Sequence, residues 1–130
     1  MILSEINVFV QLDEERHMTI NSRQKGKRGE LMIAKILREH GYDEARRSAQ
    51  YCGKTGDAAD VVGIPGYHLE IKFVEKLNIE QAMDQARRDA KAAGNGDTPV
   101  VVHKRSRKSP LVTMDLESFL TVIGKDGHSK

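Results

Sequence analysis

The chain has 130 residues, which is enough for one domain with a single core and too few for two well-built ones. Cys52 is the only cysteine, so an intrachain disulfide and a cysteine-based metal cluster are both excluded. No apolar run approaches the ~20 residues of a membrane-spanning helix, and the N-terminus lacks the pattern of a secretion signal, so we expect a soluble, cytoplasmic protein that makes no membrane contact.

Positive charge is clustered, although the net charge is only +2 and the pI is about 8.7. Four basic clusters on one small domain predict a continuous surface that faces phosphates. The candidate nucleic-acid-binding residues are Lys25, Lys27, Arg28, Arg46, Arg47, Lys54, Arg87, Arg88, Lys104, Arg105, Arg107 and Lys108.

Residues 1–17 precede a second methionine, Met18, and have no sustained helical or strand period. We expect an extra strand or arm there, or an upstream extension if Met18 is the natural start. The domain itself is expected to span residues 18–123, followed by a flexible tail at 124–130.

A first helix is predicted from Ser22 to a stop at Gly41, with an apolar stripe that includes Ile33 and Leu37. Glu30 lies three and seven positions before these residues and therefore on the same inward stripe. A carboxylate there is costly without a partner, which makes Glu30 a candidate site residue. Stabilisation of an acid near the first turn by the helix dipole is the alternative explanation.

The rest of the chain alternates strands and helices. Two short strands are expected before a Pro-Gly turn, and that turn predicts an antiparallel hairpin with the strand that follows it. The second helix ends at Gly94, and Asp115 is expected to cap the third. This order predicts an α/β fold with a mixed β-sheet flanked by helices. The expected strands span 42–51, 59–64, 67–74, 98–105 and 110–114, and the later helices span 78–94 and 115–123.

The strand ending in "HLEIKF" (68–73) places His68, Glu70 and Lys72 on one face. Asp60 lies in the preceding strand, so its carboxylate and that of Glu70 can converge on a hard cation such as Mg²⁺, with the carbonyl of Ile71 as a further ligand. Lys72 is then placed to position an attacking water or to stabilise charge on a phosphate. An exposed strand face with Glu and Lys two apart is the ordinary alternative.

Three short motifs carry a family resemblance: "GKRGE" (26–30) on the first helix, "GDAAD" (56–60) before "VVG", and "HLEIK" (68–72). Over roughly residues 22–114 the chain resembles the PD-(D/E)xK nuclease superfamily, in particular its Holliday junction resolvases and the related small phage-type endonucleases. Ala59 stands where the superfamily name has proline, which removes no ligand.

The resemblance implies a restriction-endonuclease-like fold, a magnesium-dependent reaction in which Mn²⁺ can substitute, and a site of Glu30, Asp60, Glu70 and Lys72. A glutamine on the next helix is implied as well, and Gln85 matches by position, with Gln81 as the competitor. Asp57 competes with Asp60 for the metal. Asp60 is preferred because it adjoins an apolar strand. His68 is expected to have a structural or rim role.

Three functions fit these residues. The first is an endonuclease of DNA recombination or repair that resolves branched DNA such as Holliday junctions, as a homodimer that makes two symmetric cuts. The second is a nicking or end-processing nuclease of repair or restriction type. The third is a binding module with no catalytic activity, against which the complete set of carboxylates and lysine argues, since a pure binder gains nothing from carboxylates that face phosphates.

Overall fold

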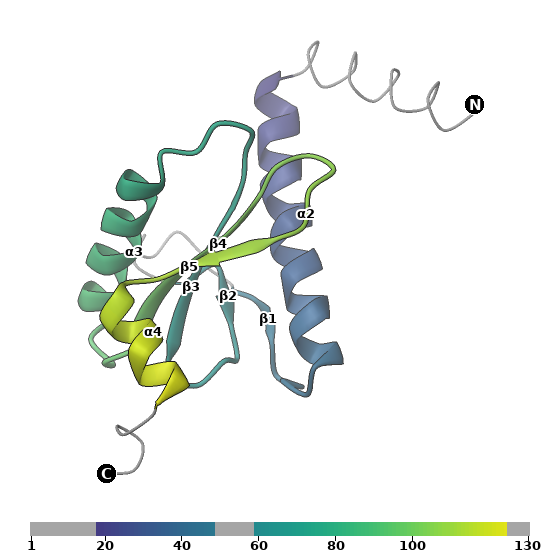
Figure 1. Ribbon diagram of the computed structural model, residues 1–130. Coiled ribbons are helices and arrows are strands. Elements are labelled where there is room, and N and C mark those ends of the chain that lie inside the picture. The colour runs from purple at the N-terminus through teal and green to yellow at the C-terminus, as the bar shows by residue number, and fades with distance from the viewer. Residues whose placement is uncertain (1–17, 49–58, 125–130) are drawn as a thin grey trace.

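The computed structural model describes residues 18–48 and 59–124. A five-stranded mixed sheet with the strand order β1-β2-β3-β4-β5 lies between α2 and α3, as Figure 1 shows. The predicted α/β fold is therefore confirmed. The segments expected to be an N-terminal arm and a C-terminal tail lie outside the described residues, except for Gly124. Within the described part, no helix is both long and apolar enough to cross a membrane.

The elements follow the predicted order. The first helix begins at Met18 and not at the predicted Ser22, and the other elements are narrower than predicted. The helices are α2 (Met18–Glu39), α3 (Ile79–Ala93) and α4 (Leu116–Ile123). The strands are β1 (Arg46–Arg47), β2 (Val61–Val62), β3 (Tyr67–Phe73), β4 (Thr98–Lys104) and β5 (Leu111–Thr113).

The hairpin of β2 and β3 forms at the Pro-Gly turn as predicted. The N–H of Tyr67 donates to the carbonyl of Ile64 at 3.2 Å, and Gly66 has a φ of 89°. Proline followed by a residue of positive φ is the pattern of a type II turn, which only glycine enters without strain. The two strands pair antiparallel with Val61 opposite Leu69.

Two expected strands are shorter than predicted. From the expected strand at 42–51, only Arg46–Arg47 is a strand among the described residues, because a turn comes first, in which Ala45 N–H donates to the Tyr42 carbonyl at 2.9 Å. The strand expected at 59–64 is limited to Val61–Val62, because the chain turns after Val62 at Gly63.

A parallel pair forms the centre of the sheet. β3 and β4 pair over their whole length, and α3 connects them across one face. The side chain of Asn78 caps α3 by accepting a hydrogen bond from Gln81 N–H at 3.0 Å, and Gly94 ends the helix in the left-handed conformation, as expected.

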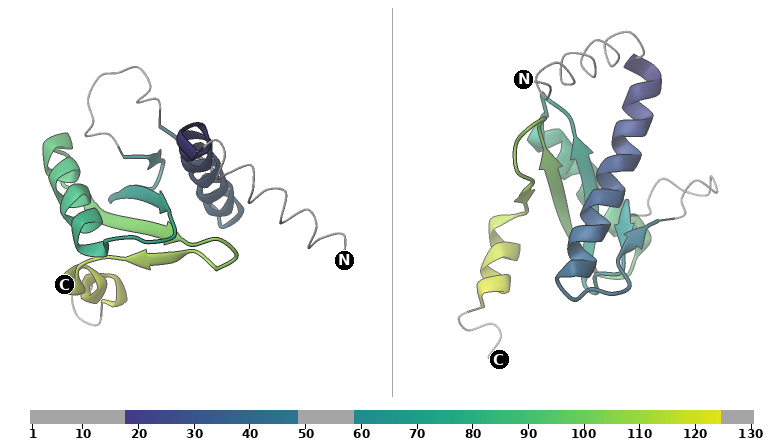
Figure 2. Two further views of the ribbon diagram at one scale, coloured as in Figure 1. Left: turned by 90° about the horizontal axis from the view of Figure 1, so that it is seen from above. Right: turned by 90° about the vertical axis from the view of Figure 1, so that its right-hand side faces the viewer.

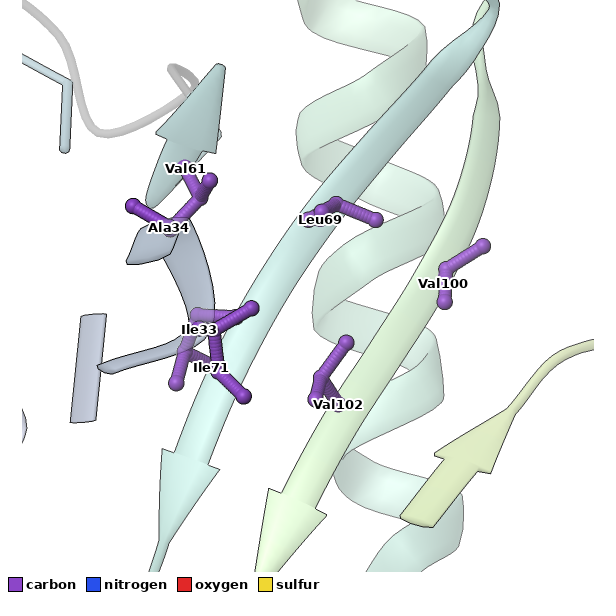
Figure 3. Close-up of a cluster of buried hydrophobic side chains, with 7 residues drawn as sticks. All are labelled: Ile33, Ala34, Val61, Leu69, Ile71, Val100 and Val102. Atoms are coloured by element: carbon purple, nitrogen blue, oxygen red, sulfur yellow. The ribbon is translucent and has the colours of Figure 1, made fainter. Parts of the chain in front are cut away.

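Side chains from alternate strand positions fill two cores on opposite faces of the sheet. Figure 3 shows the larger one, in which α2 packs on the strands β2, β3 and β4. Its buried residues are Ile33 and Ala34 from α2, and Val61, Leu69, Ile71, Val100 and Val102 from the strands. The smaller core lies under α3 and contains Ala82, Met83, Ala86 and Val101. Because β3 is covered on both faces, its polar side chains on the α3 side are inside the protein.

The predicted capping of α4 by the Asp115 side chain is wrong. Asp115 occupies the cap position as predicted, but its side chain makes no capping hydrogen bond. Its carboxylate instead accepts from the guanidinium of Arg87 on α3, with Nε 3.2 Å from Oδ2. The backbone carbonyl of Asp115 still accepts the N–H of Phe119. An ion pair to α3 has taken the place of the cap.

Candidate active site

Glu70 and Lys72 lie on the face of β3 that α3 covers. The side chain of Glu70 is 3% exposed and that of Lys72 is half-buried. The alternative of an ordinary exposed Glu and Lys on a strand face is therefore wrong. α3 packs closely here because its inner positions Ala82, Ala86 and Ala90 are small and buried.

Asp60 is placed opposite Glu70 by the antiparallel register, one step beyond the Val61–Leu69 pair. The N–H of Asp60 donates to the Leu69 carbonyl at 2.9 Å, and its Oδ2 accepts the N–H of Ile71 at 2.8 Å. A side-chain oxygen of Asp60 thus accepts this hydrogen bond just before β2 begins, where a backbone carbonyl would otherwise accept it. These bonds fix Asp60 next to Glu70 and Ile71, while its competitor Asp57 lies outside the described residues.

Glu70 belongs to a cluster that also contains His68, which is buried like Glu70, and Asp89, which is half-buried. Nε2 of His68 is 3.0 Å from Oε2 of Glu70, and one donor atom from each of the three residues lies within 4.8 Å of the others. Such a set could hold a metal ion through one nitrogen and two carboxylate oxygens. Glu70 is therefore placed between two donor sets: Asp60 on one side, and His68 with Asp89 on the other.

The cluster binds protons more strongly than isolated side chains do. Burial raises the pKa of Glu70 to about 7, and the nearby carboxylates of Asp60 and Asp89 act in the same direction. The hydrogen bond to Glu70 raises the pKa of His68 above its ordinary value. Both shifts arise because buried negative charge on this face has to be balanced by a proton or by another cation.

This proton affinity predicts a pH-dependent stability of the metal-free protein. A carboxyl whose pKa is raised on folding contributes stability that is complete below its unfolded value of 4.5 and is lost as the pH rises through about 7. The pKa of His68 is also raised, so its contribution to stability is likewise lost as the pH rises above 6.5. We expect wild-type protein in chelator to lose stability over this range relative to Glu70→Gln.

Urea unfolding of both proteins from pH 4.5 to 8 measures this difference, with Glu39→Gln at the exposed end of α2 as the control. The control should follow wild type. Parallel curves for wild type and Glu70→Gln would show that the Glu70 carboxyl carries no excess proton affinity.

Lys72 is held by the glutamine that the resemblance implied. Its Nζ donates to Oε1 of Gln85 at 3.1 Å. The competitor, Gln81, lies one turn earlier on α3 and lines the same open hollow as Lys72, Lys76, Gln85 and Arg88. Lys72 therefore has a fixed amide partner on the protein side and opens onto a polar, positively charged surface where a phosphate can approach.

Glu30 lies in α2, which covers the face of the sheet opposite to α3. A Cβ on Gly29 would lie 2.9 Å from the ring of Phe73, so glycine at this position lets α2 approach β3 closely. The Glu30 carboxylate accepts a hydrogen bond from Nε of Arg47 at 2.6 Å. The partner that a carboxylate on the inward side of α2 requires is therefore the guanidinium of Arg47 on β1.

Glu30 and Asp60 are nevertheless electrostatic neighbours. Burial raises the pKa of Glu30, with a further contribution from the negative charge of Asp60, while the hydrogen bond from Arg47 opposes the shift. Asp60 likewise raises the pKa of Glu70. Asp60 is thus coupled to one carboxylate from α2 and one from β3, and the three acids occupy one region at the start of β2.

Glu30→Gln is expected to reduce the rate of DNA cleavage by at least about tenfold, because it removes one of three coupled negative charges. It should lower the free energy of unfolding by about 1 kcal/mol or less, as expected for loss of a partly exposed ion pair. Thermal midpoint and cleavage rate should be measured on the same preparation, with Glu39→Gln on the same helix as the control. Near-normal cleavage would leave Glu30 with a structural role as the partner of Arg47.

Two of the predicted basic clusters, 23–28 on α2 and 103–108 at the end of β4 and beyond it, lie side by side. Glu75 joins them: its carboxylate is 3.6 Å from Nζ of Lys25 and accepts the N–H of Ser106 at 2.7 Å. Lys104 lies over the ring of Phe73, 5.5 Å from its centroid. The two clusters are therefore neighbours near the end of β3, the strand that contains Lys72.

The other predicted basic residues differ in their surroundings. Arg87 pairs with Asp84 and Asp115, and Arg47 pairs with Glu30, so both have acidic partners within the chain. Arg46 and Arg88 are exposed. Lys54 lies outside the described residues.

Asp89 is the site residue that sequence reasoning missed, and His68 was expected only at the rim or in a structural role. A signal for Asp89 was present: it lies between the inward positions Ala86 and Ala90 of α3 and four residues after Gln85. The reasoning that singled out Glu30, an acid beside an inward stripe, applies equally to Asp89.

A family model described as "Phage putative PDDEXK endonuclease" matches residues 21–128. No curated protein and no solved structure matches the chain. The family match confirms the superfamily that the three motifs resembled.

Proposed function

The chain belongs to the phage family of PDDEXK endonucleases, and from this premise we propose that it is a metal-dependent nuclease that hydrolyses phosphodiester bonds of branched DNA, such as Holliday junctions, as a homodimer. The observation that carries the catalytic part is the pairing of Asp60 and Glu70 across the β2–β3 hairpin, with Lys72 two residues further along β3.

The residues present fit a hard divalent cation. Asp60 and Glu70 supply carboxylate oxygens, the donors that Mg²⁺ prefers, and the carbonyl of Ile71 follows the N–H that holds Asp60. A bound Mg²⁺ would lower the pKa of a coordinated water and neutralise charge on the phosphate. Mn²⁺ can substitute, since it accepts both carboxylate and imidazole ligands, and His68 adjoins Glu70.

The protein side chains divide the remaining work. Gln85 holds the ammonium of Lys72, which then faces the hollow where it positions the attacking water or stabilises the phosphate. His68 and Asp89 orient Glu70, and Glu30 adds negative charge next to Asp60. The basic surface of α2 and the segment after β4 binds the DNA backbone without reading its sequence.

Branched DNA is proposed as the substrate for two reasons. The spacing of "GKRGE", "GDAAD" and "HLEIK" resembles that of junction resolvases. A homodimer with two sites related by a twofold axis also suits a four-way junction, whose resolution needs two symmetric cuts.

The test is incubation of the purified protein with a labelled four-way junction, a duplex of matched sequence and a single strand, in Mg²⁺, Mn²⁺ or chelator. We expect paired nicks in the junction that require metal, with Asp60→Asn as the inactive control. If the duplex were cut as fast as the junction, the assignment would change from junction resolution to a nicking or end-processing activity. Retardation of DNA without any cutting would indicate a binding module.

A further inference from the structure

The β5–α4 face, made of β5, α4 and the residues between them, exposes an unusual amount of apolar side chain. Eleven large hydrophobic side chains are exposed among the described residues, and seven of them belong to this face. They are 47% to 70% exposed: Leu111, Val112, Leu116, Phe119, Leu120, Val122 and Ile123. Contiguous apolar surface of this kind marks an interaction site in a folded protein.

The sequence of α4 has the spacing of a helix that packs, yet no residue of α4 is buried. Leu116, Phe119, Leu120 and Ile123 recur at intervals of three and four residues and form one stripe along the helix. Figure 2 shows α4 beyond β5, away from the sheet face that α2 covers. The stripe therefore has no partner among the described residues.

The position of α4 is fixed even though its stripe is uncovered. Arg87 of α3 pairs with Asp115 at the start of the helix and with Asp84 on its own helix. Met114, just before the helix, packs partly against the larger core. The helix is thus anchored at its first turn and presents its apolar side outward as a preformed surface.

We propose that the β5–α4 face is the homodimer interface, and that its occupant is the same face of a second copy in an isologous, twofold arrangement. Charge favours a second copy, because α4 contains Glu117 as its only charged residue and Asp115 is neutralised by Arg87. Two such faces meet with little like-charge repulsion, although the rest of the chain is rich in charge.

The size of the face agrees with a dimer. Seven side chains at about half exposure present roughly 700 Å² per copy, against about 800 Å² per partner in an interface of standard size. β5 is also an edge strand of the sheet, so pairing between copies would cover an edge that is otherwise open. The inference rests on the proposed homodimer and names the surface through which it forms. It depends on the exposure and charge of the β5–α4 face and not on the cleavage reaction.

The test is the mass of the full chain in solution without metal or DNA, measured by sedimentation. We expect a species of twice 14.6 kDa, and about 100-fold weaker association in Leu120→Lys, because a buried hydrophobic contact would become charged. Leu31→Lys on α2, with a similar exposure of 46% against 50%, is the matched control and should remain dimeric. The thermal midpoint of Leu31→Lys should stay near wild type, and that of Leu120→Lys should fall only at concentrations where wild type is dimeric.

Monomeric wild type at roughly 100 µM would overturn the proposal. If that monomer also lost thermal stability in Leu120→Lys, a segment of the chain itself would be the occupant. A dimer unaffected by Leu120→Lys would place the interface elsewhere and equally overturn it. Since no DNA or metal is present, each outcome is independent of the cleavage assay.

Discussion

Asp60→Asn and Glu70→Gln are each expected to reduce metal-dependent cleavage by at least about 10³-fold, because each removes a carboxylate whose cation supplies several kcal/mol of charge stabilisation. DNA binding should be unchanged or tighter, since a negative charge that faces the phosphates is lost. The measurement is single-turnover cleavage of a labelled junction, together with retardation of the same DNA.

Both variants are expected to fold. The pKa of Glu70 is raised to about 7, so the buried cluster already accommodates a neutral group at this position, and Gln is close to the protonated acid in shape. The amide oxygen of Asn at position 60 can still accept the N–H of Ile71. Asp43→Asn and Glu39→Gln, at exposed positions, are the matched controls. Full activity in both site variants would exclude these carboxylates from the reaction.

Lys72→Ala is expected to lower the cleavage rate by ~10²–10³, the range typical for loss of one preorganised group that stabilises charge in the transition state. Metal binding should be retained, because an ammonium stabilises the water or the phosphate and is not a metal ligand. Single-turnover rates and a titration of Mn²⁺ followed by calorimetry separate the two effects.

Gln85→Ala should reproduce part of this loss, because it frees the Lys72 ammonium from its amide partner without removing the charge. Lys76→Ala, an exposed lysine that lines the same hollow, is the control for a general loss of positive charge. If Lys72→Ala and Lys76→Ala reduced the rate equally, Lys72 would be one phosphate-binding residue among several and not part of the catalytic group.

The amino-acid sequence alone was enough to predict the helices, the hairpin and the alternation of β3. Each of these depends on neighbours a few residues apart: the Pro-Gly turn, the period of two that separates Leu69 from Glu70, and the helix stop at Gly94. Such local patterns determine element type and the face of each side chain. They placed Asp60 next to Glu70 across the hairpin and Lys72 on the same face as Glu70, although in the structure Asp60 lies just before β2 and not within it.

Tertiary packing decided which partners these side chains meet. The pairing of Glu30 with Arg47, the entry of Asp89 into the Glu70 cluster and the recruitment of Asp115 by Arg87 all join different elements. No local period encodes them, because they depend on how closely α2 and α3 approach the sheet at Gly29 and at the alanines of α3. The same packing buried Glu70 and left the stripe of α4 uncovered, since burial depends on the elements that lie opposite a side chain and not on its own segment.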